Sequence, residues 1–394
     1  MLTLLFWVGF GMSPLESPVI ENGPKPAGKA KTLVLTEDLR LGPEDGDEEY
    51  FWTGPDARVH PTRDGKMFVL DDGNNRILLF DKEGKFLKQI GRPGAGPGEF
   101  DGLRSMMWLE KDGLVAFEFL LNAGSVHYFD AEFAFQKEEG LNNFGERLDT
   151  AKFAYNGRWL FGTNATFEAD RGAVVHRSFL MNNRFERVHE VLKYERAPFN
   201  GQRATDQDYW REYLAEAIST FAKGLSAYGA FARDGTIYTA VASKYEVSVW
   251  DQEGKKIRVF KREYKPITQT DEEVRAIVDP LFEDVQSQLP GQLRSLFTPG
   301  VAADAVEMAN FPPVKNPIFG LVTMDNGMVL VIHDRSWIER TETADIFDGE
   351  GRFLGSYKHP AIGLSFMEFL NGYAYTMEDV DDEKYLVRYK VSIQ

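Results

Sequence analysis

The sequence predicts an all-β fold, a six-bladed β-propeller of four-stranded antiparallel blades with helical insertions between blades 3 and 4 and between blades 4 and 5. Three observations predict it. Aromatic residues make up 13% of the 394 residues, and 36 glycines punctuate short apolar runs, as in proteins built from many turn-linked strands. A unit of strands and turns recurs along the chain. Two of the intervals between its copies are lengthened by segments with helical periodicity.

The clearest copy of this unit covers residues 59–100. Its apolar runs are separated by turn signals such as Asp64-Gly65 and Glu83-Gly84. With the preceding strand they give four antiparallel strands, the content of one propeller blade, at residues 57–60, 67–70, 77–80 and 86–90.

The third strand of the unit identifies the other copies, because it ends in a polar residue preceded by an aromatic one. This ending recurs in six places, in weaker form in the third and sixth, with its polar residue at positions 81, 130, 182, 251, 348 and 390. The sixth copy lacks one strand before the chain stops. We therefore expect an N-terminal strand at residues 32–39 to pair with the last blade and close the ring, since an unpaired edge would otherwise stay exposed.

These assignments divide the chain into three parts. Residues 1–13 are a candidate signal segment, because residues 2–12 are an apolar run too short to span a bilayer but suited to a secretory signal. Residues 14–31, rich in Pro and Gly, are expected to form a linker. Residues 32–394 form a single propeller domain. The prediction is an extracytoplasmic protein, periplasmic or secreted, with no integral membrane span.

Charge and cysteine content restrict the chemistry. A net charge of −16 disfavours nucleic acid as a partner, because phosphate backbones are repelled. The absence of cysteine excludes disulfides, thiolate metal sites and cysteine nucleophiles.

The first blade resembles the NHL type of six-bladed propeller. The residues that carry the resemblance are Leu70-Asp71, residues 74–77, Phe80-Asp81, Glu83-Gly84 and residues 91–100. The chain is also similar in layout to the exported bacterial members of that group. The resemblance implies the fold first, since propellers host binding proteins, lyases and lactonases alike.

The two insertions lie at about residues 194–225 and 263–317. Amphipathic periodicity predicts helices at 205–221, with Thr205 as N-cap, and at 270–289, with a capping box from Thr270 and Glu273. A short helix is expected at 300–310. In a propeller both connections share a rim with the loops between second and third strands, so candidate functional residues concentrate there.

Metal chemistry has few candidates in this sequence. The amidating lyases of the resembling family place histidines from separate blades around one ion, but only His60 and His333 of six histidines are expected near the central face, too few without carboxylates. Acidic loops at residues 378–383 and at Asp71 and Asp72 would suit calcium, yet their spacing matches no EF-hand loop. No cofactor is firmly implied, calcium is the one that these loops could hold, and catalytic and metal-binding residues stay unassigned.

The loop at residues 333–340 mixes cationic, acidic and aromatic side chains, which suits an anionic or sugar-like ligand. Arg335 and Trp337 are expected to be exposed enough that replacing both by Ala leaves the melting temperature within a few degrees. The candidate ligand-binding residues are His60, Asp71, Arg76, Trp210, His333, Arg335 and Trp337, with Asn122, Asn164, Lys244 and Glu378 as further rim positions.

The sequence thus predicts a ligand-binding or protein-interaction propeller without assigned catalysis, whose partner is a small molecule, a glycan or a protein. The alternative is a metal-assisted hydrolase or lyase with its site at the central opening. Three or more His, Asp or Glu side chains converging on the pore would favour the enzyme, and an aromatic-lined, uncharged groove would favour the binder.

Overall fold

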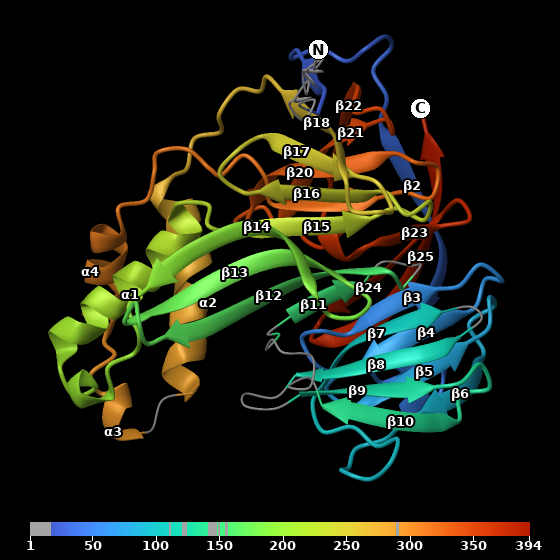
Figure 1. The fold of residues 1–394 in the computed structure, drawn as a ribbon, viewed down its shortest axis with the longest axis horizontal. Coiled ribbons are helices and arrows are strands. Elements are labelled where there is room, and N and C mark those ends of the chain that lie inside the picture. Colours follow the sequence, from blue (N-terminus) through green and yellow to red (C-terminus); the bar gives the residue numbers. More distant parts are fainter. Residues whose placement is uncertain are drawn as a thin grey trace, which may run out of the picture.

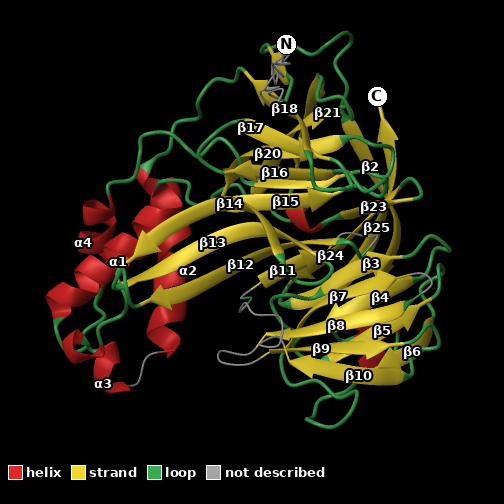
Figure 2. Cartoon of the chain, viewed as in Figure 1, coloured by secondary structure: helices red, strands yellow, loops and turns green. Residues whose placement is uncertain are grey.

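Six sheets follow one another along the chain in the computed structural model, which describes residues 17–109, 112–119, 124–140, 148, 150–153, 157–288 and 291–394 (Figures 1 and 2). Five of them are four-stranded and antiparallel, and the sheet of β15 to β18 has the same four antiparallel strands with β1 added as a fifth strand. We number them blades 1 to 6. The strands of blades 1 to 3 are β3 (Arg58–Pro61), β4 (Met67–Asp71), β5 (Arg76–Phe80), β6 (Phe86–Ile90), β7 (Leu103–Leu109), β8 (Gly113–Phe119), β9 (Gly124–Phe129), β10 (Phe135–Gly140), β11 (Thr150–Phe153), β12 (Trp159–Glu168), β13 (Ala173–Asn182) and β14 (Arg187–Arg196).

Blades 4 to 6 complete the set. Their strands, with the two N-terminal ones, are β1 (Val19–Asn22), β2 (Leu33–Leu41), β15 (Ala227–Phe231), β16 (Ile237–Val241), β17 (Glu246–Trp250), β18 (Lys256–Arg262), β19 (Gly320–Thr323), β20 (Val329–Ser336), β21 (Thr341–Phe347), β22 (Phe353–His359), β23 (Glu368–Leu370), β24 (Tyr373–Val380) and β25 (Glu383–Ile393). The first strands of neighbouring blades contact each other from β7 through β11, β15, β19 and β23 to β3, and β7 contacts β4. The first strands therefore surround the axis of a closed ring.

Each sheet buries both faces, because alternate residues of a strand point to opposite sides. In β4, Met67 and Val69 pack against blade 6, whereas Phe68 and Leu70 pack against blade 2. The same division repeats around the ring, and each neighbouring pair of blades shares one hydrophobic cluster. The two middle strands of blade 1, β4 and β5, are accordingly near-continuous apolar runs.

The N-terminal strand β2 forms the outer edge of blade 6. It pairs antiparallel with β25 from Leu33 opposite Ile393 to Leu41 opposite Leu386, so blade 6 combines the two ends of the propeller. Asp38 reinforces the pairing through Arg388 at 2.6 Å and Lys390 at 2.8 Å.

Residues 14–31, expected to be a linker, contain the strand β1, which pairs in parallel with β18 at the outer edge of blade 4. Asn22 then joins blade 4 to blade 5: its amide donates to Lys261 O (3.0 Å) and Gly351 O (2.9 Å), and its Oδ1 accepts from Phe353 N (2.8 Å). The chain continues along β22, where Lys31 N donates to Leu354 O (2.9 Å). We call residues 17–32 the N-terminal strap.

The strap approaches β22 so closely that a side chain would not fit. A Cβ at Gly355 would overlap Lys31 O, so glycine is required at this position. The strand escapes sequence analysis because only four residues pair, and Pro and Gly surround them.

Helices gather on one side of the ring, beside the projecting ends of β12, β13 and β14 (Figure 1). Helix α1 (Gln207–Ala222) lies between β14 and β15, and α2 (Asp271–Gln288), α3 (Gly291–Arg294) and α4 (Pro299–Ala309) lie between β18 and β19. They share one hydrophobic cluster that includes Trp210, Val278 and Phe297, and we call these four helices the cap. None of the described helices is both long and apolar enough to cross a membrane.

The helix ends follow from local chemistry. Asp206, rather than Thr205, caps α1 by accepting from Asp208 N (2.9 Å). Thr298 caps α4, Pro299 occupies its first turn, and Asn310 ends it in the left-handed conformation.

We predict that the propeller depends on β2. Deleting residues 1–41 removes a whole blade-6 strand with the buried Leu33 and Leu41, and should lower the melting temperature by on the order of 10 °C or more. Deleting residues 1–30 removes β1 and Asn22 and should cause a smaller decrease. Differential scanning calorimetry, with a deletion of residues 1–16 as reference, checks this order. Equal melting temperatures for all three would refute it.

Candidate functional site

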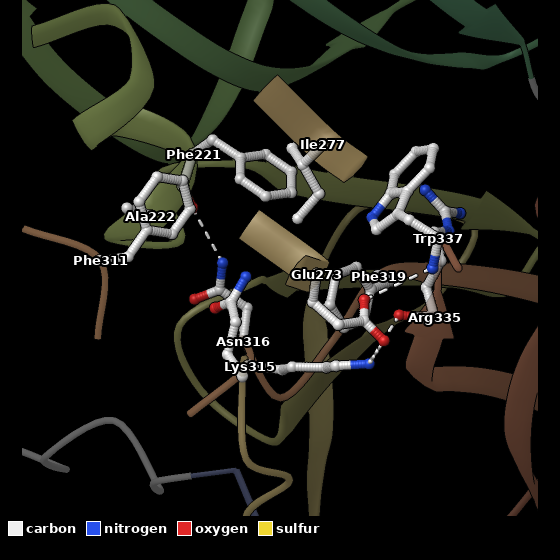
Figure 3. A pocket seen from close by; sticks show the side chains of 11 residues that line it. Phe221, Ala222, Glu273, Ile277, Phe311, Lys315, Asn316, Phe319, Arg335 and Trp337 are labelled. Carbon is white, nitrogen blue, oxygen red and sulfur yellow. Dashed lines mark hydrogen bonds and ion pairs between the residues drawn. The ribbon is translucent and has the colours of Figure 1, made fainter. Parts of the chain in front are cut away.

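A cleft lies where the cap meets blade 5 (Figure 3). Its empty space is about 270 Å³ including the opening to solvent, but only about 10 Å³ is wide enough for a water-sized sphere, roughly the room for one water molecule. Aromatic side chains form much of the wall. The lining residues are Phe221, Ala222, Gln269, Glu273, Ile277, Phe311, Lys315, Asn316, Phe319, Arg335 and Trp337.

Lys315 is the centre of a buried charge network that fastens the cap to blade 5. Its ammonium group donates to Glu273 Oε1 (3.1 Å) on α2 and to Asp334 Oδ1 (3.1 Å) on β20, and also to Arg335 O (3.0 Å). The Lys315 side chain is 7% exposed. A buried ammonium group is tolerated because it is paired and fully hydrogen-bonded.

Glu273 accepts from blade 5 as well as from Lys315. Ser336 Oγ donates to its Oε1 (3.2 Å) and Trp337 N to its Oε2 (3.4 Å). Thr270 Oγ1 accepts from Glu273 N (3.2 Å), so half of the expected capping box is present. The Glu273 carboxylate turns to the cleft and blade 5.

Arg335 pairs with a fully buried carboxylate. Its Nε donates to Glu342 Oε1 (2.7 Å), and Glu342 Oε2 accepts from Gly363 N (3.1 Å) and Leu364 N (2.7 Å). Glu342 is 0% exposed and the Arg335 side chain 15% exposed. The guanidinium carbon also lies 5.3 Å from the Trp337 ring centroid and 5.7 Å from that of Phe319.

Two sequence expectations about this region are therefore wrong. Residues 333–336 belong to strand β20, because the β20–β21 hairpin continues to the pair Ser336 and Thr341 instead of opening into a loop. Arg335 is an ion-paired and mostly buried side chain, so its replacement by Ala is not a mild surface change.

Trp337 carries the unsatisfied group of the cleft. Its indole Nε1 is buried and has no hydrogen-bond partner, and in Figure 3 it is directed to the space between Ile277 and Glu273. A buried N–H without an acceptor costs free energy, and a water or a ligand oxygen in the cleft would satisfy it.

Trp210 and His333, two other predicted ligand-binding residues, face elsewhere. Trp210 is 3% exposed in the interior of the cap, where its Nε1 donates to Ala204 O (2.8 Å).

His333 lies between blades 4 and 5, with Nε2 3.3 Å from Asp345 Oδ1. Asp345 also contacts Arg262 and Tyr245 and accepts from Ser356 Oγ (2.6 Å). Burial alone would raise the pKa of Asp345, but His333 and these hydrogen bonds hold it below its usual value.

Asp71 and Arg76 form an internal ion pair of blade 1. Arg76 Nε donates to Asp71 Oδ2 (2.7 Å), and its terminal nitrogen donates to Glu48 O (2.6 Å) and Phe51 O (3.0 Å). Asp71 Oδ1 accepts from Thr53 N (2.9 Å), and Asp71 is 0% exposed. Both side chains hold residues 48–53 against the β4–β5 turn, which accounts for their polar character within a buried sheet.

His60 lies on β3 and faces the ring axis, with Nδ1 2.6 Å from Glu368 Oε1 on β23. The remaining rim positions are dispersed. Asn164 is buried on β12, Lys244 lies in the β16–β17 turn, Glu378 accepts from Arg40 (2.9 Å), and Asn122 lies outside the described residues.

For a metal ion, one group of three candidate ligands occurs among the described residues. Glu118, His127 and Glu138, on β8, β9 and β10, bring their ligand atoms within 4.8 Å of one another. His127 Nε2 lies 3.0 Å from Glu118 Oε2, and Ser125 Oγ and Asp101 N also donate to Glu118, so two members are joined by the protein's own contacts. Burial would raise the pKa of Glu118, but these hydrogen bonds hold it below its usual value. In the acidic turn proposed for calcium, Asp379 pairs with Lys384 at 2.7 Å.

The fold defines the chain as a six-bladed β-propeller. A family model described as a 6-bladed beta-propeller (DUF5128) matches residues 58–171. A member of the duf4221 family from Bacteroides vulgatus is similar in structure, with a TM-score of 0.51 at 11% identity over 92% of this chain and 98% of that one. No curated protein matches the sequence.

Two further structures are similar. A Bacteroides fragilis protein whose description proposes export has a TM-score of 0.49 at 12% identity, over 95% of this chain and 99% of that one. Virginiamycin B lyase from Staphylococcus aureus has a TM-score of 0.38 at 9% identity, over 91% and 99%. At such identities likeness speaks to the fold alone.

Sequence reasoning placed Arg335 and Trp337 at the cleft but missed Lys315, Glu342 and the role of Glu273. Glu273 is recognisable only as part of a helix start, and Lys315 follows a Pro-Pro pair that suggests a rigid connection. No local pattern shows that their partners lie tens of residues away.

We predict that Arg335→Ala lowers the free energy of unfolding by about 3–5 kcal/mol, because it leaves the Glu342 carboxylate buried without its cation. The double variant Arg335→Met, Glu342→Gln should recover more than half of this loss, since Gln keeps an acceptor for Leu364 N. Urea unfolding measures both, with Arg352→Ala as the exposed control. A loss in Arg335→Ala no larger than in the control would contradict the assignment.

We also predict a pH dependence from His359, which pairs across the sheet with Glu342. Burial lowers its pKa, against the opposing effect of Glu342 and Glu378. The unfolded chain therefore takes up a proton near pH ~6.5 while the folded chain does not, so this histidine makes stability fall as the pH decreases through that value. His359→Gln should flatten the decrease in unfolding free energy between about pH 7.5 and 5.5. An unchanged slope would show that His359 is not responsible.

Proposed function

We propose that the protein is a ligand-binding β-propeller of the NHL-like exported type, which acts outside the cytoplasm and to which no catalysis is assigned. The observation that carries the binding function is the aromatic-lined cleft with one unsatisfied donor, the indole N–H of Trp337. The proposed location rests on the apolar run at residues 2–12, which suits a secretory signal.

The composition of the cleft supports a ligand whose inserted part is uncharged. Lys315 and Arg335 are both neutralised by carboxylates of the protein, so they do not demand an anion. Phe221, Phe311 and Phe319 supply apolar surface. A ligand that stacks an apolar face on this wall and places one oxygen near Trp337 Nε1 would satisfy the donor, and neutral sugars combine these two properties.

The small volume fixes how much of the ligand enters. Space for about one water molecule accommodates a single hydroxyl or carbonyl group, while the rest of the ligand lies in the opening between the cap and blade 5. Exchange of a water for a ligand oxygen conserves the hydrogen bond and gains the stacking contact. The helical insertions between blades 3 and 4 and between blades 4 and 5 act in this proposal as the outer wall of the binding site.

The enzymatic alternative has weaker support. It requires several His, Asp or Glu side chains around the axis, whereas the described axial residues discussed above contribute one histidine and one glutamate, His60 and Glu368. The group Glu118, His127 and Glu138 is distributed over the second, third and outer strands of blade 2, away from the first strands that surround the axis.

We predict that Trp337→Phe weakens sugar binding by about three- to tenfold, the effect of one hydrogen bond, without a large change in melting temperature. A panel of neutral mono- and oligosaccharides is titrated against the purified full chain by calorimetry. Trp52→Phe is the matched control, because Trp52 Nε1 is likewise buried without a partner but lies in the cluster between blades 1 and 6. The proposal fails if no saccharide binds, or if Trp337→Phe binds as tightly as the control.

A further inference from the structure

Charged side chains from four blades gather at the axis of the ring. Arg58 and His60 lie on β3, Lys152 on β11, Arg233 follows β15, and Glu368 begins β23. We call these five residues the axial cluster. They come from positions far apart in the sequence, and only the closure of the ring brings them together.

The cluster contains more positive than negative charge. Glu368 is its single carboxylate and is shared: Oε1 lies 2.6 Å from His60 Nδ1, and Oε2 lies 3.9 Å from a terminal nitrogen of Arg233. A terminal nitrogen of Arg58 lies 3.5 Å from Asp56 Oδ1, and Asp56 is not a member of the cluster. The charge of Asp72 also interacts with the Arg58 guanidinium group. Within the cluster itself three basic side chains accompany one carboxylate, in a chain whose net charge is −16, and the carboxylates of Asp56 and Asp72 act on Arg58 but not on the lysine of the cluster.

Lys152 is destabilised as a cation mainly because the surrounding protein removes part of the water around its ammonium group. Desolvation lowers its pKa; Glu368 opposes this, and Arg58 adds to it. Burial would raise the pKa of Glu368, but His60, Arg233 and Lys152 hold it below its usual value. The ammonium group of Lys152 is therefore less stable as a cation than in water, and an anion beside it would reverse that.

Solvent reaches the cluster. Protein surrounds Lys152 closely enough to desolvate its ammonium group, yet the residue keeps solvent-accessible surface. The side chains of Arg58, His60 and Arg233 are 28%, 25% and 18% exposed. The Arg58 guanidinium carbon also lies 4.1 Å from the ring centroid of Phe366, which is 50% exposed. A small molecule at the axis would thus meet cations and one aromatic face.

We propose that the axial cluster binds the oxyanion of a small molecule, a carboxylate or a phosphate. Lys152 and Arg58 contact the anion, Phe366 contacts its apolar part, and Glu368 holds His60 and Arg233 in place. Charge-assisted hydrogen bonds from Lys and Arg are the strongest contacts that a protein offers such groups. This site is formed by residues other than those of the cap cleft and does not depend on sugar binding there.

The test is calorimetric titration of the full chain with sodium phosphate and with citrate, at an ionic strength held constant with sodium chloride. Saturable binding of either probe is expected. Tighter binding of phosphate assigns a phosphorylated ligand, and tighter binding of citrate assigns a carboxylated one. If neither probe produces a saturable signal, the proposal is overturned.

Substitutions distinguish anion binding at the axial cluster from a non-specific attraction of anions to the charge of the whole protein. Lys152→Gln should weaken binding by about tenfold or more, whereas Lys152→Arg should retain it. Lys82→Gln makes the same charge change on an exposed turn of blade 1, where the Lys82 side chain is 66% exposed, and should bind like the wild type. Equal losses in Lys152→Gln and Lys82→Gln would overturn the proposal.

Glu368→Gln gives a test of opposite sign. Removing the carboxylate that competes for the same cations should tighten anion binding by several-fold, although it should lower the melting temperature. A folded Glu368→Gln variant that binds the anion more weakly than the wild type would overturn the assignment of roles, and the Lys152 variants decide the matter should this variant not fold.

Discussion

Burial of both faces of every sheet is the constraint on which this structure depends. A single blade such as β3 to β6 exposes Met67 and Val69 on one side and Phe68 and Leu70 on the other, so it cannot be stable without a neighbour on each side. Every blade needs a neighbour on both sides for this reason, and only a closed ring gives each blade two neighbours. This requirement explains why β2 must join blade 6, and why residues such as Glu368 and Lys152 meet at the axis although they are far apart in the sequence.

Buried charge fixes the cap to this ring. Lys315 and Glu273 join α2 to β20, and Arg335 and Glu342 hold the neighbouring hairpin. Pairs of this kind contribute geometry more than net stability, because desolvation offsets much of their attraction. Their consequence for function is that the charged groups around the cleft are already satisfied, while the indole N–H of Trp337 is not. The axial cluster shows a different arrangement, in which Glu368 is the one carboxylate among its five members and is shared by His60 and Arg233.

The fold was predictable because one sequence unit repeats along the chain: apolar strands, turn glycines and the polar residue that ends the third strand recur in the same order. Strand β1 was not, since its four residues become a strand only beside β18. The candidate site was predictable in part. Residue type and rim position led to Arg335 and Trp337, but the same reasoning selected Asp71 and Arg76, which pair with each other inside blade 1. Composition shows that a residue is polar; only the partners, such as Glu342 for Arg335, show whether it is free to bind.

The N-terminal strap has a mechanical consequence. From β1 on blade 4 it passes through Asn22 to the side of blade 5 and reaches blade 6 as β2, so one short segment is bonded to three consecutive blades. A force that pulls on the chain ahead of β1 acts first on the parallel pairing with β18, then on the contacts with β22, and only afterwards on the strand that completes blade 6. The contacts of the strap must therefore break one after another before the pairing of β2 with β25, whose loss would open the ring, is loaded.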